Sequence, residues 1–149
     1  DLEAARSVAD QMLQLLDDLD ALAACDPQLS LKRWLDDASA WGTTPEESAY
    51  YRRNARTIIT VWGDSKTLLD YATRLWSGLV KSYCAPRWEM YIAEILSCIE
   101  DGREYDQTAF FECLTEFEKS WAVSDDPVVY NEPVCPVTLS REIISRYSL

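Results

Sequence analysis

Apolar residues recur every three or four positions along most of the chain, and this spacing places them on one face of an α-helix. The first such segment runs to the Asp26-Pro27 pair, where it ends because a proline disfavours helical geometry in the residue before it. A second helix is expected from Ser30 to Gly42. The pattern predicts an all-α protein.

The clearest helix start is the sequence TPEE. Thr44 can cap a helix, Pro45 suits its first position, and Glu47 lies three residues after the cap, as in a capping box. The helix that begins here is expected to end at Gly63, because glycine readily takes the left-handed conformation that closes helices.

Three further helices are predicted after Gly63. The first begins at Asp64 or Ser65 and would carry Leu68, Ala72, Leu75, Trp76, Leu79 and Tyr83 on one face. The others run from Pro86 to Gly102 and from an Asp106 cap to Trp121. The stretch SDDPVVYNEPVCPV has three prolines and no helical period, which predicts an extended segment before a last helix over 138–147. The expected fold is an all-α bundle of about six to seven helices with short loops.

Composition narrows the possible functions. The 149 residues suit one domain, and the formal charge of −12 disfavours nucleic acid and anionic membrane surfaces, which attract clusters of Lys and Arg. No apolar run approaches the roughly 18–20 residues of a membrane span, so no membrane insertion is expected. A chain that starts at Asp1 without methionine is expected to be a piece of a longer protein.

The available side chains exclude most catalytic devices. The chain has no histidine, which removes Ser-His and Cys-His nucleophile pairs. Its five cysteines form no C-x-x-C pair, so no metal site is expected, and no cofactor motif is present. The carboxylate pairs Asp17/Asp20 and Glu46/Glu47 have the spacing of solvent-facing or capping residues. The sequence therefore predicts no catalytic residue and no cofactor.

Some residues admit both a packing role and a binding role. Five tryptophans lie on apolar helix faces and are expected in the core: Trp34, Trp62, Trp76, Trp88 and Trp121. Trp62 precedes a loop, where its ring can also contact a sugar. Asp70, on the predicted helix, is free to pair with Arg74, four residues on. Gly78 within that helix suggests the close approach of another backbone.

Three motifs carry a family resemblance: NARTIITVWG from Asn54, LLDYA around Asp70, and YCAPRW, which ends at Trp88. Together with the upstream LLDDLDALAACDPQLSLKRWLDDA, they resemble the C-terminal helical domain of α-N-acetylglucosaminidases, glycoside hydrolase family 89. The likeness is strong over 13–88 and looser to the end. One departure is Cys84 after Tyr83, where the family often has a second tyrosine.

The resemblance implies that residues 1–149 are a single helical domain, the C-terminal domain of a larger retaining glycosidase that removes terminal α-linked N-acetylglucosamine. The catalytic (β/α)8 barrel would lie outside this chain, which is then inactive alone. The implied substrate-binding residues are Trp62, Leu68 and Tyr71, with Leu68 and Tyr71 on one helix face. A buried polar network would support these substrate-binding residues structurally. Its members would be Asn54, Arg56, Asp70 and Arg87.

The resemblance also implies a lysosomal, secreted or periplasmic location, and partners limited to the barrel of the same polypeptide and the glycan. Two alternatives stay open from the residues alone. One is a free-standing helical interaction module that binds a partner in a groove beside Trp62 and Tyr71. The other is an autonomous carbohydrate-binding domain, from which measurable binding of N-acetylglucosamine by the isolated chain would be expected.

Overall fold

The computed structural model describes residues 2–63 and 69–147, and every described element is helical. It has six α-helices and one π-helix, in the order α1 (Leu2–Ala24), α2 (Leu31–Ser39), α3 (Pro45–Ile58), η1 (Val80–Cys84), α4 (Ala85–Asp101), α5 (Gln107–Val123) and α6 (Pro136–Tyr147). The predicted all-α class is confirmed.

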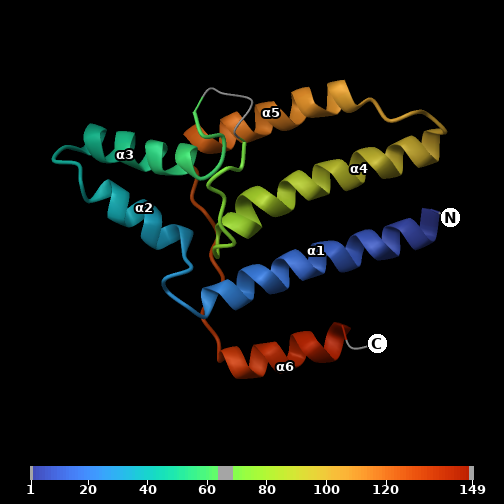
Figure 1. Ribbon diagram of the computed structural model, residues 1–149, viewed down its shortest axis with the longest axis horizontal. Coiled ribbons are helices and arrows are strands. Elements are labelled where there is room, and N and C mark those ends of the chain that lie inside the picture. The colour runs from blue at the N-terminus through green and yellow to red at the C-terminus, as the bar shows by residue number, and fades with distance from the viewer. Residues whose placement is uncertain (1, 64–68, 148–149) are drawn as a thin grey trace.

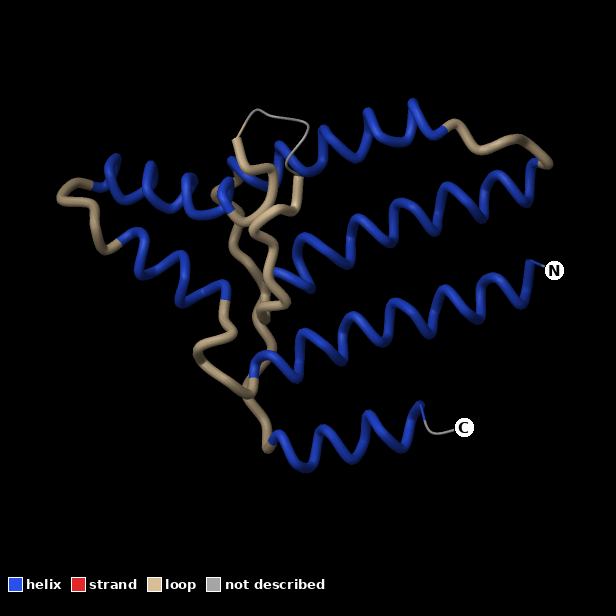
Figure 2. The backbone as a smooth tube through the Cα atoms, viewed as in Figure 1, coloured by secondary structure: helices blue, strands red, loops and turns tan. Residues whose placement is uncertain are grey.

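The helices form two groups (Figures 1 and 2). Helices α5, α4, α1 and α6 lie side by side, each antiparallel to the next, and α2 and α3 form a helical hairpin beside them. The segment 69–79 and the extended segment 124–135 pass between the two groups. The long irregular segments therefore meet at the centre of the molecule.

Helix starts follow the predicted signals, but α2 ends at Ser39 and α3 at Ile58, before the predicted ends at Gly42 and Gly63. Ser30, Thr44 and Asp106 each accept a hydrogen bond from the backbone N–H three residues later, which satisfies a donor that the first turn leaves free. Gly102 ends α4 in the left-handed conformation, with φ of 63°. The extended segment before α6 is confirmed as well.

The predicted helix from Asp64 or Ser65 to Tyr83 is wrong over residues 69–79. Residues 69–79 are irregular, and helical structure starts only at Val80, in η1. The backbone here bonds to distant segments: Asp70 N donates to Thr60 O at 2.9 Å, and Ser77 N donates to Leu29 O at 2.8 Å. The start of that prediction and Leu68 lie outside the described residues. The apolar spacing misled because long-range backbone hydrogen bonds fix this segment in an irregular course, and only 77–79 of it is buried.

The main core joins the helical hairpin to the central segments. It consists of Leu31, Leu35, Ala55, Ile59, Leu79, Tyr83 and Trp121. Of the five tryptophans expected in the core, only Trp121 is buried, while Trp62 and Trp76 are half-buried, and Trp34 and Trp88 are exposed. Indole rings are large and often keep one edge in solvent, which sequence spacing does not reveal.

Gly78 lies outside any helix, with φ of +84°, and the segment 128–130 passes close to it. A Cβ at this position would lie 2.5 Å from Cε1 of Tyr130. The predicted close approach therefore exists, but it is made by the side chains of Val128 and Tyr130 instead of a backbone.

Gly78→Ala is expected to lower the free energy of unfolding by about 2–3 kcal/mol, because left-handed strain adds to overpacking. Gly102→Ala is the matched control, since Gly102 also has positive φ but nothing lies within 4 Å of the added Cβ. It should cost about 1 kcal/mol from strain alone. Urea unfolding of both variants measures the difference, and equal losses would show that Tyr130 does not restrict this site.

Candidate functional site

Trp62 and Tyr71 form an aromatic pair on the central irregular segment. Their ring centroids lie 5.0 Å apart with an interplanar angle of 66°, an edge-to-face arrangement. Tyr71 is 70% exposed and Trp62 is half-buried. The two described residues of the predicted substrate-binding set thus lie together. Tyr71 is not on a helix, and Leu68 lies outside the described residues.

Backbone geometry brings the two rings together. α3 ends at Ile58, and the chain then turns so that Trp62 N donates to Thr57 O at 2.8 Å. Trp62 and Asp70 both have positive φ, 53° and 60°, which is uncommon for residues other than glycine. Such strained residues persist only where the surrounding contacts hold them.

Asp70 supplies those contacts beside Tyr71. Its backbone N–H donates to Thr60 O, and its carboxylate accepts from Thr73 Oγ1 at 3.1 Å. Thr73 Oγ1 also lies at 2.8 Å from Ile59 O, to which it can donate. These bonds tie the chain on the two sides of Trp62 and Tyr71 to each other, so the pair has a fixed support.

A charge cluster that joins Asp70 and Arg87 to the buried Glu118 lies behind Tyr71. Arg87 Nη2 donates to Asp70 Oδ2 at 2.7 Å and lies 2.8 Å from Glu118 Oε1, an ion pair without hydrogen-bond geometry. The guanidinium also lies over the ring of Tyr83, with Cζ 4.8 Å from its centroid. Glu118 is only 1% exposed. The cluster links α4 and α5 to the irregular segment that carries Tyr71.

Burial and charge shift the pKa values of this cluster in opposite ways. Burial raises the pKa of Glu118, and nearby Arg87 only partly offsets this. Burial lowers the pKa of Arg87, but Tyr83, Asp70 and Glu118 raise it more, so its net shift is upward. Burial also raises the pKa of Cys84 to about 11, which keeps that thiol protonated at neutral pH.

The predicted polar network of Asn54, Arg56, Asp70 and Arg87 is divided in the structure. Asp70 and Arg87 pair directly, so the alternative Asp70–Arg74 pair is wrong. The Arg74 guanidinium instead donates to backbone carbonyls next to it. Asn54 is exposed, in a groove between α2 and α3. Sequence spacing cannot distinguish these positions because each depends on which helix faces which.

Arg56 belongs to a separate cluster at the end of α5. It is 2% exposed, and its guanidinium donates to the carbonyl oxygens of Trp121, Ser124 and Asp126. Its Cζ lies 4.7 Å from the ring centroid of Trp121. Burial lowers the pKa of Arg56, but the carbonyls at the C-terminal end of a helix favour a cation. Arg56 thereby fixes the start of the extended segment.

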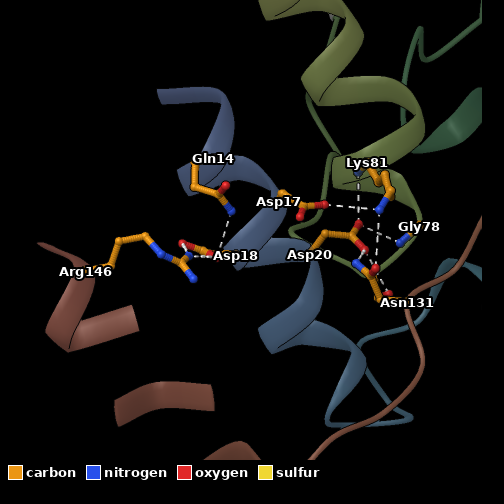
Figure 3. A network of polar contacts seen from close by, with 9 residues as sticks. Gln14, Asp17, Asp18, Asp20, Gly78, Lys81, Asn131 and Arg146 are labelled. Carbon is orange, nitrogen blue, oxygen red and sulfur yellow. Dashed lines mark hydrogen bonds and ion pairs between the residues drawn. The ribbon is translucent and has the colours of Figure 1, made fainter. Parts of the chain in front are cut away.

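Two buried aspartates of α1 were not expected (Figure 3). Asp20 is fully buried and accepts hydrogen bonds from Gly78 N, Lys81 N, Ser77 Oγ and Asn131 Nδ2. It thus holds the start of η1 and the extended segment together. The expectation that Asp20 faces solvent is wrong.

Asp18 lies on another face of α1 and joins it to α6. Its carboxylate pairs with Arg146 and accepts from Tyr147 Oη at 2.8 Å. Burial raises the pKa of Asp18, but the Arg146 and Tyr147 bonds outweigh burial and lower it overall. Asp18 therefore remains ionised at neutral pH.

A sequence signal for the buried acids did exist. Asp20 lies four residues after Leu16 and three before Ala23, and Glu118 lies four after Leu114 and three before Trp121. Both acids therefore share the apolar face of their helix. A charged residue on such a face indicates a buried and paired group.

A cavity of about 420 Å³ opens beside the Asp70–Arg87 pair, between α4 and α5. Its remaining walls are largely aromatic: Trp88, Tyr91, Tyr105, Phe110 and Phe111, with Leu114. Within the described residues, no group of three or more His, Cys, Asp or Glu is placed to hold a metal ion. No described helix is long and apolar enough to span a membrane.

These observations define an all-helical domain. It carries an aromatic pair, Trp62 and Tyr71, next to an ion-pair cluster that contains the buried Glu118. The family model of the α-N-acetylglucosaminidase (NAGLU) C-terminal domain matches residues 1–146, and the chain belongs to this family. Human α-N-acetylglucosaminidase is 28% identical over 134 residues, which cover 90% of this chain and 18% of that protein.

Solved structures agree on the fold. A family 89 glycoside hydrolase from Clostridium perfringens, in complex with PUGNAc, has a TM-score of 0.78 and 25% identity over 97% of this chain and 17% of its own. Another Clostridium perfringens structure, in complex with its substrate GlcNAc-α-1,4-galactose, has a TM-score of 0.77 at 24% identity. The match covers 95% of this chain and 17% of that chain, and it shows the fold alone. The chain thus spans about 17–18% of the length of these relatives.

Proposed function

We propose that this chain is the non-catalytic C-terminal domain of an α-N-acetylglucosaminidase, that it packs on a catalytic barrel elsewhere in the same polypeptide, and that it lines part of the pocket for terminal α-linked N-acetylglucosamine. The observation that carries the proposal is the Trp62–Tyr71 pair: a half-buried indole in edge contact with an exposed tyrosine ring, next to residues with positive φ. The lengths of the relatives favour a domain over a free-standing interaction module.

Each side chain has a chemical role in this proposal. The face of the Trp62 ring is electron-rich and suits the C–H groups of a pyranose. The Tyr71 hydroxyl is a donor and acceptor for a sugar hydroxyl. Leu68 would contact the sugar or its acetamido methyl group. Asp70 and Arg87 would act through the backbone, because they hold the segment next to Tyr71.

Catalysis is assigned to the rest of the polypeptide. A retaining glycosidase needs two carboxyl groups about 5 Å apart that both reach the sugar. Asp70 and Glu118 are close to each other through Arg87, but Arg87 pairs with both and Glu118 is 1% exposed. A substrate cannot contact Glu118 without opening the core. The chain alone is therefore expected to be inactive, and we infer from the family resemblance a lysosomal, secreted or periplasmic location for the whole enzyme.

In the full-length polypeptide, Trp62→Ala is expected to lower kcat/KM for an aryl α-N-acetylglucosaminide, because the sugar loses an apolar ring contact. The expected loss is about 10- to 100-fold, which corresponds to about 1.4–2.7 kcal/mol of transition-state binding. Trp41→Ala is the matched control, since Trp41 is a 79% exposed tryptophan outside the pair. It should leave kcat/KM unchanged.

Thermal unfolding of each variant separates binding from folding. Tyr71→Phe removes only the hydroxyl and keeps the ring contact, so it should fold normally and lose a smaller part of kcat/KM. Wild-type kinetics in Trp62→Ala and Tyr71→Phe would contradict the pocket role, and an inactive wild type would contradict the proposed enzyme.

A further inference from the structure

Half of this domain is a layer only one helix thick. Helices α5, α4, α1 and α6 lie next to one another in the plane of Figure 1, which is viewed down the shortest axis of the molecule. The buried core cluster lies at the opposite end, around α2 and α3. No residue of 2–17 is buried, α4 has only Cys98 buried, and α6 has none. A helix layer of this kind normally needs a second layer to bury its apolar side.

An apolar groove of about 470 Å³ lies between α1 and α4 on this layer. From α1 it is lined by Val8, Met12 and three alanines, and from α4 mainly by Ile92 and Ile95. Val8 is 65% exposed, which is unusual for a β-branched apolar residue at the centre of a groove. A groove between two neighbouring helices has the shape into which the side-chain ridge of a third helix packs, and alanines allow a close approach.

The lining of the groove indicates what kind of helix fits. It is apolar except for the hydroxyl of Tyr91, and the Arg6–Glu100 ion pair joins α1 to α4. The net charge of −12 on each copy disfavours a second copy of the chain as the occupant. A helix with an apolar stripe complements this lining.

The geometry points to an amphipathic helix of the same polypeptide, outside residues 1–149, docked with its apolar face in the α1–α4 groove. This inference rests on the proposed function, in which the chain is one domain of a longer enzyme. Its relatives are long enough to supply such a helix, because the chain covers only 17–18% of their length. The groove is separate from the Trp62–Tyr71 pair and contributes none of its residues to it.

The test is photocrosslinking in the full-length polypeptide at low concentration. A benzophenone amino acid replaces Val8 in one variant and Asp10 in the other, and the matched Asp10 is exposed on the same helix, two positions away. Mass spectrometry of the digest should show a crosslink from position 8 to a helical peptide outside 1–149 in the same polypeptide, with little crosslinking from position 10. Crosslinks between two polypeptides, crosslinks only within 1–149, or equal yields at both positions would each overturn the inference.

A second measurement does not depend on the photoreaction. Val8→Arg should lower the thermal midpoint of the full-length enzyme, because it places a charge in a buried contact, whereas Asp10→Arg should not. Hydrolysis by the same wild-type preparation tests the proposed function separately. An active enzyme without the position 8 crosslink overturns only the docking, and a crosslinked but inactive enzyme overturns only the proposed activity.

Discussion

Replacing Arg87 with methionine is expected to lower the free energy of unfolding by about 3–5 kcal/mol near pH 7, which is the usual cost of leaving a buried partner charge uncompensated. Glu118, which is 1% exposed, would lose its ion pair, and the strained Asp70 would lose the same cation. Methionine keeps much of the apolar stem that packs on Tyr83. The loss of stability therefore measures the effect of removing the positive charge.

The loss should depend on pH in a defined direction. The native pKa of Glu118 is already above its ordinary value because of burial, and Arg87 holds it down. Without Arg87 this pKa rises further, so folding then favours the protonated acid. A group with a raised native pKa loses its contribution as the pH rises through that value. The difference between wild type and Arg87→Met should thus be larger at pH 7 than at pH 5.

The double variant Arg87→Met/Glu118→Gln provides the control. It removes the buried negative charge together with its partner, so it should be more stable than Arg87→Met alone at pH 7 and should lack most of the pH dependence. The cycle is completed by denaturant unfolding at pH 5 and pH 7 of four proteins: wild type, Arg87→Met, Glu118→Gln and the double variant. If the double variant is no more stable than the single one, Glu118 is not the uncompensated charge.

Asp20→Ala is expected to cost about 3–5 kcal/mol, because it leaves the buried N–H groups of Gly78 and Lys81, along with two side-chain donors, without their acceptor. Asp17→Ala is a matched control on the same helix. Asp17 has a 54% exposed side chain and one ion pair with Lys81, so its loss should cost less than 1 kcal/mol. Equal effects in urea unfolding would show that Asp20 is not a structural acceptor.

The two variants should also differ in where they act. Asp20 joins α1 to the start of η1 and to Asn131, so its loss should increase hydrogen exchange in 77–84 and 124–135 before the rest of the chain. Uniform exchange across the chain would instead indicate loss of global stability alone.

Local signals in the sequence determined most of the helices. Caps at Ser30, Thr44 and Asp106 and the stop at Gly102 act within one turn of the chain, so their neighbours in sequence are their partners in space. The motifs in 54–88 were long enough to indicate the family, which the family model then confirmed. These features need no knowledge of the tertiary structure.

The tertiary structure alone decided the course of 69–79 and the partners of the buried charges. The apolar spacing there predicts a helix, but Asp70 and Ser77 bond to Thr60 and Leu29, residues far away in the sequence. The pairing of Arg87 with Glu118, and of Arg56 with carbonyls at the end of α5, likewise depends on which helices pack together. Periodicity reports the face of a helix that is buried, whereas the partner on that face is set by long-range packing.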